Sequence, residues 1–296
     1  MTERPLAMTD RPLATTGQSL DTSLLRDIEM LAVELAEQAG AAITSRLGSL
    51  LSVRYKTGAE TEATLRNPVS EVDEQVEGVI RERLAARFPE HGVIGEEMAD
   101  SHDTDLDMIW AVDPVDGTSN FINGFPLFAA SIGVLHRGRP VVAAVWCATS
   151  HALRSGVYHA RLGGGLHFDR QPLARASNPM VHRRLAGVPQ FRGGRHPYDL
   201  RKTGSAAIEC AFVAAGLLEA ASFNSPNIWD VAGGILLVQE SGGQVLTRGR
   251  GKRWQPFEGF VATPLRDWRG GLILGSADGA GWMAGNPGVA GQDEPA

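Results

Sequence analysis

Two aspartates three positions apart, Asp113 and Asp116, follow an apolar run that is typical of a buried strand. The whole segment reads WAVDPVDGTSNF. Within it Pro114 has no N–H and fixes its own φ, and Gly117 allows backbone angles that other residues avoid. Such a segment can direct two carboxylates and a backbone carbonyl at one point and then turn N–H groups toward an anion. Because Mg²⁺ usually combines a few carboxylates with phosphate oxygens, the segment predicts a metal and phosphate site.

Taken alone, this motif is also compatible with a solvated turn or with the start of a helix, since Asp, Pro and Gly favour turns. Two other acidic segments support the metal hypothesis. Glu96 and Glu97 come directly after the short apolar run 93–95, and Asp230 stands at the beginning of an apolar helical segment. Because Asp is also favoured as a helix cap, Asp230 can cap its helix, bind a metal, or do both.

Together, the three segments resemble the signature blocks of the inositol monophosphatase family, the Mg²⁺-dependent, lithium-sensitive sugar phosphatases. The resemblance extends over roughly residues 24–276 and keeps the family's order of blocks. It implies a mixed α+β or α/β fold, the layered αβαβα sandwich of the inositol monophosphatase and fructose-1,6-bisphosphatase type. It also implies a phosphoric monoester hydrolase that acts on a small sugar or cyclitol phosphate, is cytoplasmic and forms a homodimer.

The metal ligands follow from the resemblance, residue by residue. Glu96, Asp113 and the carbonyl of Val115 correspond to one Mg²⁺ site. Asp113, Asp116 and Asp230 correspond to a second site, with Asp113 bridging the two. The family implies two to three ions in total, and all of the expected ligands are present in this chain.

The resemblance also implies catalytic and phosphate-binding roles. The Thr118 hydroxyl would hydrogen-bond the water that attacks phosphorus, and would itself pair with Asp73 of the segment NPVSEVD. The N–H groups of Gly117, Thr118 and Ser119 would hold the phosphate at a helix N-terminus. Asp73 and Glu96 are both candidates for the proton acceptor, and the sequence does not separate them.

Three further positions are less determined. Glu97 either lies behind the metal ligands or is exposed. Lys56 is the candidate for a lysine that the family places before the NPVSEVD segment, but the intervening stretch is longer than in the family, so Arg66 could replace it. A family turn that contacts the alcohol portion of the substrate is matched by Gly204, Ser205 and Ala206.

Substrate choice depends on the residue seven positions before Asp230, where members specific for inositol phosphate have a glutamate. Here that residue is Phe223, unless the loop is shifted and Asn224 or Ser225 takes the role. Because a phenyl ring accepts no hydrogen bond from a hydroxyl, we expect inositol 1-phosphate to be accepted without being the best substrate. Fructose-1,6-bisphosphate, histidinol phosphate and a 3′-phosphonucleotide are alternatives. A non-catalytic, metal-binding regulatory protein is an alternative of another class.

Composition limits the possible partners. The chain has 296 residues, 43% of them hydrophobic, and a net charge of −6, which argues against general nucleic-acid binding. Apolar runs of about 18 residues, which a membrane span needs, do not occur, and no apolar stretch follows the basic N-terminus, so we expect neither a membrane span nor a secretory signal. Cys147 and Cys210 lie in apolar segments and are expected to be packed thiols.

Residue periodicity predicts the elements that position these groups. Helices are expected from Asp21 or Thr22 to Gly48 and over 74–88, 205–219 and 230–241. Strands are expected near 93–95, 108–113, 128–136, 140–147, 153–160, 165–168, 220–223, 244–247, 258–262 and 271–275. We expect an N-terminal α+β metal-binding half over 21–150 and a C-terminal α/β half over 151–276. Residues 1–20 and 277–296 are predicted to be disordered tails.

Overall fold

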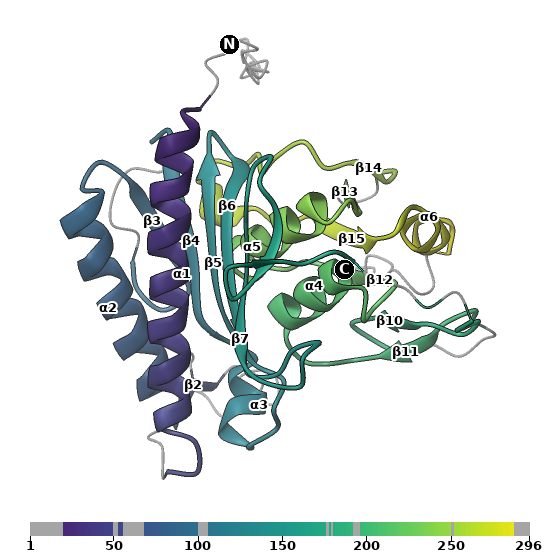
Figure 1. The fold of residues 1–296 in the computed structure, drawn as a ribbon, viewed down its shortest axis with the longest axis horizontal. Coiled ribbons are helices and arrows are strands. Elements are labelled where there is room, and N and C mark those ends of the chain that lie inside the picture. Colours follow the sequence, from purple (N-terminus) through teal and green to yellow (C-terminus); the bar gives the residue numbers. More distant parts are fainter. Residues whose placement is uncertain are drawn as a thin grey trace, which may run out of the picture.

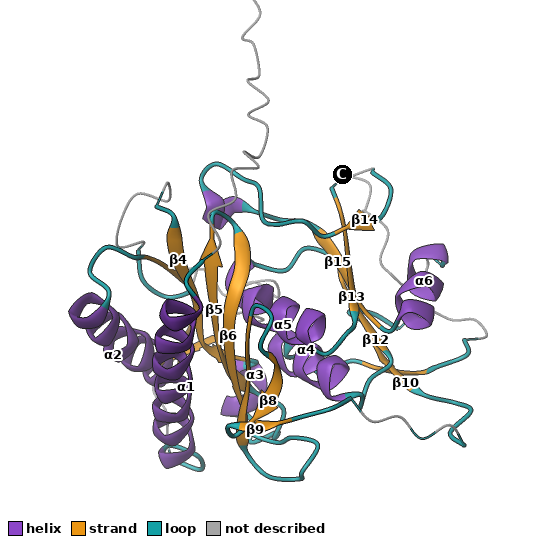
Figure 2. Ribbon diagram, turned by 45° about the horizontal axis from the view of Figure 1, so that its top comes forward, coloured by secondary structure: helices purple, strands orange, loops and turns teal. Residues whose placement is uncertain are grey.

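A computed structural model describes residues 20–49, 53–55, 68–99, 106–175, 178, 180–191, 196–249 and 252–286 of the chain. Their helices and strands form five layers, which Figures 1 and 2 show from two directions. The layers follow one another in the order helices, sheet, helices, sheet, helix. The αβαβα sandwich that the sequence implies is therefore the observed fold.

The helical layers have the following bounds. The first layer contains α1 (Thr22–Ser45) and α2 (Glu71–Arg87), the third contains α4 (Ala206–Ala215) and α5 (Ile228–Glu240), and the fifth contains α6 (Ala277–Gly285). Helix α1 begins where the Asp21 carboxylate accepts the N–H of Ser23 at 2.9 Å, and it buries an apolar face that includes Ile28 and Leu35. Helix α2 begins three residues earlier than predicted, with Asp73 in its acidic first turn, where negative charge stabilises a helix.

Seven strands form the second layer, and their order in the sheet is their order in the chain. They are β3 (Gly92–Gly95), β4 (Met108–Asp116), β5 (Ala129–His136), β6 (Arg139–Cys147), β7 (Gly156–Arg161), β8 (Gly165–Phe168) and β9 (Gln171–Pro172). Strands β3 and β4 are parallel, with Gly95 paired to Val112, and every later pair is antiparallel. The parallel pair brings the end of β3 beside the end of β4, where the predicted site residues lie.

Six strands form the fourth layer in the order β11, β10, β12, β15, β13, β14. Their bounds are β10 (Leu185–Gly187), β11 (Asp199–Arg201), β12 (Ala220–Phe223), β13 (Gln244–Arg248), β14 (Gln255–Pro256) and β15 (Gly271–Gly275). Four further elements are short: β1 (Val53–Tyr55) and β2 (Pro68–Ser70), which pair with each other, the helix α3 (Thr118–Ile122) and the 3₁₀ helix η2 (Leu265–Asp267).

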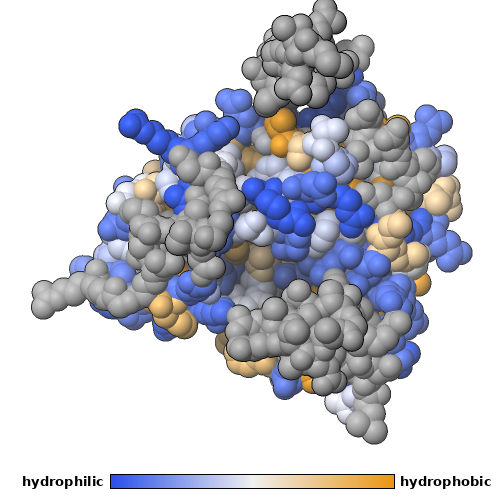
Figure 3. Space-filling model, turned by 180° about the vertical axis from the view of Figure 1, so that it is seen from behind, coloured by the Kyte–Doolittle hydropathy of each residue, from blue (hydrophilic) through white to orange (hydrophobic). Residues whose placement is uncertain are grey.

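Three apolar cores hold the layers together. One lies between α1, α2 and the first sheet, the largest lies around α4 and α5 between the two sheets, and a small one lies under α6. Helix α5 approaches the first sheet closely, because a Cβ at Gly133 of β5 would lie only 2.5 Å from the N atom of Gly233. This close packing brings the first turn of α5 to the end of the first sheet. On the part of the back face that the structure describes, hydrophilic side chains predominate (Figure 3).

Three predictions about the fold need correction. The first sheet continues to Pro172, so the boundary between the halves does not lie at 150, because β7 returns from β6 as its antiparallel neighbour. The C-terminal tail is not disordered from residue 277, since α6 forms there, capped by the Ser276 side chain and anchored by the buried Met283. The strand predicted at 258–262 is absent, because Phe260 inserts into the core and its N–H bonds to Gly138 rather than to a strand.

The predicted tails fall largely outside the described part of the chain. Residues 1–19 and 287–296, which contain most of the two predicted tails, lie outside the described residues. Within the described residues, every helix is too short or too polar to cross a membrane.

Candidate active site

Asp113 and Asp116 come together because β4 is irregular between them. In a regular strand, residues three apart face opposite sides of the sheet. Here three steps along β4 correspond to two steps along β5, since Asp113 pairs with Ser131 and Asp116 pairs with Ala129. The extra residue is a β-bulge, which Pro114 favours because it has no N–H for the ladder. The bulge re-aims the second aspartate toward the first.

Glu96 joins them from the neighbouring strand. It follows the last residue of β3, and its N–H donates to the carbonyl of Val112 at 3.3 Å. The parallel pairing of β3 with β4 therefore extends by one residue and places Glu96 beside Asp113. The adjacent Glu97 is also half-buried, and its backbone N–H donates to the Glu77 carboxylate at 2.8 Å.

Asp230 lies in the first turn of α5 and combines the two roles considered for it. One carboxylate oxygen accepts the N–H of Asn227 at 2.9 Å, which completes the helix start. At the same time the side chain is coupled to the β4 carboxylates, since burial and then the charge of Asp116 raise the pKa of Asp230 to about 8. Helix capping and membership of the acidic group are thus compatible.

The acidic group contains two buried aspartates, Asp113 and Asp116, and two half-buried acids, Asp230 and Glu96. Burial raises the pKa of Asp113 well above its usual range, and the charges of neighbouring carboxylates raise it further; they belong to Glu96, Asp116, Asp230 and Asp73. Burial also raises the pKa of Asp116 to about 6. The hydrogen-bond donors that we find on the three aspartates are neutral: Val115, Ser205, Ala207 and Asn227. Within the described part of the chain, the hydrogen bonds to these three aspartates bring no positive charge, and hard oxygen ligands of this kind fit a divalent cation such as Mg²⁺.

Thr118 begins α3 and lies between the bulge and α2. Its Oγ1 is 2.9 Å from the carbonyl oxygen of Val115 and 3.1 Å from Oδ1 of Asp73, so its single proton has two possible acceptors. The hydrogen bond expected between Thr118 and Asp73 is therefore present. Asp73 is almost fully buried, with 1% of its surface exposed, in the first turn of α2.

The turn before α3 exposes backbone N–H groups. Gly117 has a φ of 87°, and a Cβ there would lie 3.0 Å from the carbonyl oxygen of Leu127, so only glycine suits this position. Its carbonyl accepts the N–H groups of Asn120 and Phe121. The N–H groups of Gly117, Thr118 and Ser119 come before these in the chain, where a helix start leaves donors without intrahelical partners.

The predicted substrate turn at 204–206 contacts the acidic group itself. Ser205 caps α4, and its hydroxyl donates to Oδ2 of Asp116 at 2.5 Å. The N–H of Ala207 donates to the same oxygen at 2.6 Å. Gly204 has a φ of 81° and lies against the side chain of Asn120. The start of α4 thus holds Asp116 from the C-terminal half of the chain.

Several residues at this place were not anticipated from the sequence. The Asn120 amide donates to the carbonyls of Leu127 and Thr203, at 2.6 and 2.8 Å, and so ties the α3 turn to the α4 turn. Glu209 accepts from the N–H and hydroxyl of Thr203, and burial raises the pKa of Glu209 to about 7. The position of Asn120 inside the aspartate motif could have indicated that it belongs to the site. The role of Glu209 could not be predicted, because its partners depend on the tertiary fold.

Among the residues whose roles the sequence left open, the structure describes Phe223 but not Lys56 or Arg66. Phe223 ends β12 and is 8% exposed, with its side chain in the core around α4 and α5. Lys56 and Arg66 lie outside the described residues, so their roles stay predictions.

Two other groups of carboxylates lie away from this site and carry counter-charges. Glu29, His159 and His167 are close enough to hold a metal ion, but the Glu29 carboxylate is paired with His159 at 2.7 Å and with Arg161 at 3.1 Å. The second nitrogen of His159 accepts the N–H of Arg170. This network resembles an internal ion pair more than a metal site.

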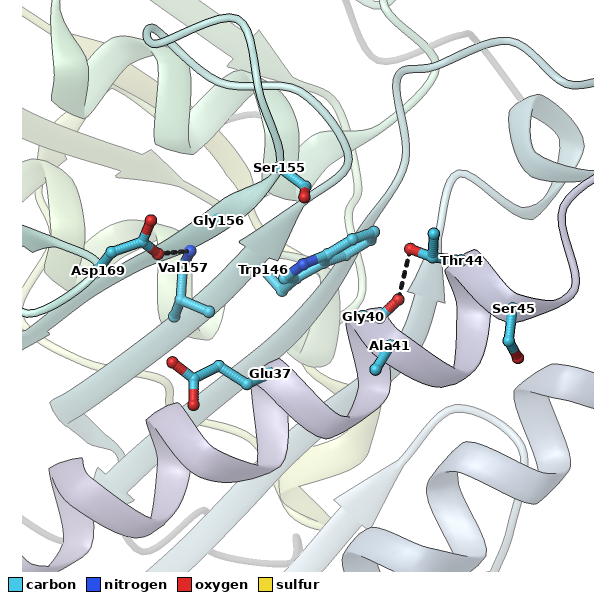
Figure 4. Close-up of a pocket in the computed structure, with 10 residues that line it drawn as sticks. All are labelled: Glu37, Gly40, Ala41, Thr44, Ser45, Trp146, Ser155, Gly156, Val157 and Asp169. Atoms are coloured by element: carbon cyan, nitrogen blue, oxygen red, sulfur yellow. Dashed lines mark hydrogen bonds between the residues drawn. The ribbon is translucent and has the colours of Figure 1, made fainter.

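The second group lines a hollow of about 630 Å³ between α1 and strands β6 and β7. Figure 4 shows the indole of Trp146 on its floor, with Glu37 and Asp169 at the same side of the hollow. Both carboxylates form ion pairs, Glu37 with Arg170 and Asp169 with Arg154. The hollow is lined by none of the predicted site residues.

Comparisons with known proteins identify the family of this chain. The profile described as the inositol monophosphatase family matches residues 24–274, so the chain belongs to that family. It is 33% identical over 221 residues to "Nus factor SuhB" of Escherichia coli K12, covering 68% of this chain and 80% of that protein. It is 30% identical over 230 residues to "Inositol-1-monophosphatase" of a Synechocystis species, covering 73% and 77%.

A solved structure supports the same assignment. The fold resembles that of a Staphylococcus aureus IMPase-II with bound inositol monophosphate. The TM-score is 0.65 at 25% identity, and the match covers 88% of this chain and 93% of the other.

Proposed function

We propose that this protein is a Mg²⁺-dependent phosphomonoesterase that hydrolyses a small sugar or cyclitol phosphate. The observation that carries the proposal is the acidic group of Asp113, Asp116 and Asp230. The first two are buried and the third is half-buried, and all three receive only neutral hydrogen-bond donors among the described residues. Charges in this state need cations, and cations placed there can neutralise a phosphoryl group.

The proposed ligands divide into two sites. Glu96, Asp113 and the Val115 carbonyl would hold one ion, and Asp113, Asp116 and Asp230 the second, with room in the family scheme for a third. When bound, Mg²⁺ supplies Lewis-acid catalysis and makes water a better nucleophile at neutral pH. The bonds from Ser205 and Ala207 occupy Oδ2 of Asp116, which directs its other oxygen to this purpose.

The remaining roles belong to the turn around α3. The N–H groups of Gly117, Thr118 and Ser119 would bind the phosphate oxygens, as an N-terminal helix turn does with anions. The Thr118 hydroxyl, held by Asp73 at 3.1 Å, would orient the attacking water. Asp73 and Glu96 remain the two candidates for the proton acceptor, and Gly204, Ser205 and Ala206 would face the alcohol portion of the substrate.

The decisive experiment is a phosphate-release screen with Mg²⁺. The panel contains inositol 1-phosphate, other sugar phosphates, fructose-1,6-bisphosphate, histidinol phosphate and 3′-phosphonucleotides, compared by kcat/KM. An ungapped match puts Phe223, which is packed in the core, at the position of the family's inositol-binding glutamate, with Asn224 or Ser225 as the alternative if the loop is shifted. We therefore expect inositol 1-phosphate to be hydrolysed without leading the panel. A lead of tenfold or more for inositol 1-phosphate would show that Phe223 does not limit it.

Lithium offers a second test of the metal sites. We expect millimolar Li⁺ to inhibit the Mg²⁺-supported reaction, because Li⁺ would occupy the site that includes Asp116 and Asp230. A titration with LiCl, matched by NaCl at equal concentration, measures this. Equal rates in the two salts would argue against a family-like second site and leave the phosphatase proposal standing.

A regulatory protein is the second candidate, because one relative at 33% identity is named a Nus factor. The screen separates the two candidates, since a regulatory protein without catalysis would release no phosphate from any member of the panel.

We further propose that the protein is a cytoplasmic homodimer, with apolar side chains such as Phe125, Leu153 and Met180, which are 51%, 91% and 76% exposed, available for a second copy. Light scattering after size exclusion measures the oligomeric state.

A further inference from the structure

The turn at 95–98, which carries Glu96, rests on a buried carboxylate from another element. Glu77 lies in α2, four residues after Asp73 and therefore on the same face of the helix, and its exposed fraction is 0%. Its Oε2 accepts the N–H of Glu97 at 2.8 Å, and its Oε1 accepts the N–H of Met98 at 3.2 Å. Both bonds fix the backbone immediately after Glu96.

The fit of the turn against this carboxylate leaves no spare room. A Cβ added at Gly95 would lie 2.1 Å from Oε1 of Glu77. Arg81, one helical turn after Glu77, donates to Oε1 of Glu77 at 2.8 Å and to the carbonyl oxygen of Met98 at 3.2 Å. The turn is therefore bound through N–H and carbonyl groups to a single pair of side chains on α2.

The C-terminal half holds the same turn from its other end. The guanidinium of Arg266, in η2, donates to the carbonyl oxygen of Gly95 at 3.4 Å. It also lies 5.6 Å from the ring centroid of Trp229, the residue before Asp230. Two elements that would each supply a metal ligand are thus connected through the turn.

We propose that Glu77 is a positioning residue that sets the geometry of Glu96 for metal binding. The inference rests on the proposed function for the identity of the metal. Glu77 is not itself placed as a ligand, because its oxygens already accept from Glu97, Met98 and Arg81. Its charge is balanced by Arg81, so the pair adds order to the turn without adding a net negative charge to the acidic group.

The test measures metal binding directly. Metal-free protein is titrated with Mn²⁺, and the free ion is followed by electron paramagnetic resonance, for the wild type, Glu77→Gln and Glu82→Gln. Glutamine keeps the size of Glu77 but turns an NH₂ group toward one of the two backbone N–H groups and removes the charge that Arg81 binds. Glu82 is exposed on the same helix and is the matched control.

We expect the Mn²⁺ dissociation constant of at least one site to rise about tenfold in Glu77→Gln and to stay within twofold in Glu82→Gln. The half-saturating Mg²⁺ concentration for phosphate release should rise in parallel, while kcat at saturating Mg²⁺ stays within about threefold. A loss of stability alone would lower the amount of active protein and would not weaken metal binding while kcat at saturating Mg²⁺ stays nearly unchanged. Wild-type Mn²⁺ affinity in folded Glu77→Gln would overturn the proposal.

Glu77→Asp keeps the test decisive if Glu77→Gln does not fold, because it retains the charge and the Arg81 pair but is too short to reach both N–H groups. We expect its Mn²⁺ affinity to fall by at least threefold, and an unchanged affinity overturns the proposal. The outcome is separable from that of the proposed function. A wild type that binds Mn²⁺ but hydrolyses no substrate rejects the phosphatase, whereas equal Mn²⁺ binding by wild type and variant rejects only the role of Glu77.

Discussion

The pKa values of two buried carboxylates of this protein, Glu29 and Asp113, are shifted in opposite directions. Glu29 is 7% exposed and Asp113 is 2% exposed, so both have lost most of their water. Burial acts to raise the pKa of Glu29, but the hydrogen bonds from His159 and Arg161 and the charge of Arg161 outweigh it, and the pKa is lowered. Burial raises the pKa of Asp113 as well, and there the neighbouring carboxylates add to the effect.

The comparison shows that burial alone does not identify a functional acid. Glu29 carries its counter-charge within the chain, so its network serves the packing of α1 on β7. Asp113 lies among other acids, and its carboxylate accepts a hydrogen bond from the neutral N–H of Val115. An uncompensated group of this kind costs stability unless something binds to it, which is why it points to a ligand.

Asp113→Asn should remove most of the activity. Because Asp113 would bridge two ions, we expect a loss of about 10³-fold or more in kcat/KM, equivalent to several kcal/mol of transition-state stabilisation. The fold should persist, since removing one of several like charges relieves repulsion. Phosphate release at saturating Mg²⁺ measures the effect. Asp107→Asn, which changes an exposed acid just before the same strand, should leave the rate unchanged. Activity of Asp113→Asn within tenfold of the wild type would refute the bridging role.

The complementary change is Glu29→Gln. Breaking a buried ion pair costs about 3–5 kcal/mol, and because Arg161 keeps 20% of its side chain exposed we expect about 2–3 kcal/mol less free energy of unfolding. Activity should stay within twofold. Urea unfolding provides the measurement, with Glu34→Gln as control, since its pair with Arg83 is exposed and long at 3.9 Å. A tenfold loss of activity in folded Glu29→Gln would mean that the two groups are not independent.

The members of the acidic group could be predicted from the sequence because the patterns that mark them are local. Asp113, Asp116 and Gly117 stand in one short segment, and the apolar runs before Glu96 and Asp230 mark a strand end and a helix start. Most strands were likewise predicted to within a few residues, because continuous apolar runs such as 129–136 are buried on both faces. The layer order came from the family resemblance, since periodicity does not specify which sheet a strand joins.

What the sequence did not reveal depends on contacts between distant segments. Glu77 looks like any acid on an amphipathic helix until the turn at 95–98 packs on it, 20 residues further along the chain. Helix α6 was missed because its many Ala and Gly residues give no clear apolar stripe, and its stability depends on Met283 entering a core built by β12 and β15. The bulge in β4 was not predicted, because its register is defined by the partner strand.

The smallest expected effect is the pH dependence of stability in the metal-free protein, and it separates the two groups by sign. Asp116 and Asp230 have folded-state pKa values raised to about 6 and about 8, whereas the unfolded chain loses these protons near pH 4. The folded state therefore binds more protons over this range, and the free energy of unfolding falls as the pH rises. Glu29, whose pKa is lowered from 4.5, acts the other way, and its contribution is lost only as the pH falls below that value.

Three histidines oppose this trend at lower pH. Burial lowers the pKa of His91, His136 and His151, so these residues favour the folded state increasingly as the pH rises toward 6.5. Above pH 6.5 the unfolded histidines are already mostly neutral and contribute little. In the range from pH 6.5 to 8 the pH dependence therefore comes mainly from acids with a raised pKa, among them Asp230 with a pKa of about 8 and Glu209 with a pKa of about 7.

Over this range of 1.5 pH units we expect the free energy of unfolding of the metal-free protein to fall by about 2 kcal/mol, given about 1.4 kcal/mol per pH unit for each proton that the folded state holds and the unfolded state has lost. Urea unfolding in EDTA at several pH values measures it. Asp230→Asn should make the profile flatter, since it removes a group whose folded-state pKa is about 8, whereas Glu29→Gln should lower the whole profile without changing its slope. Saturating Mg²⁺ should abolish the fall, because an ion that binds the ionised carboxylates stabilises the folded protein more as they lose their protons. If the metal-free profile is flat, or if Asp230→Asn retains the slope, the acidic group is not the uncompensated cluster that distinguishes it from Glu29.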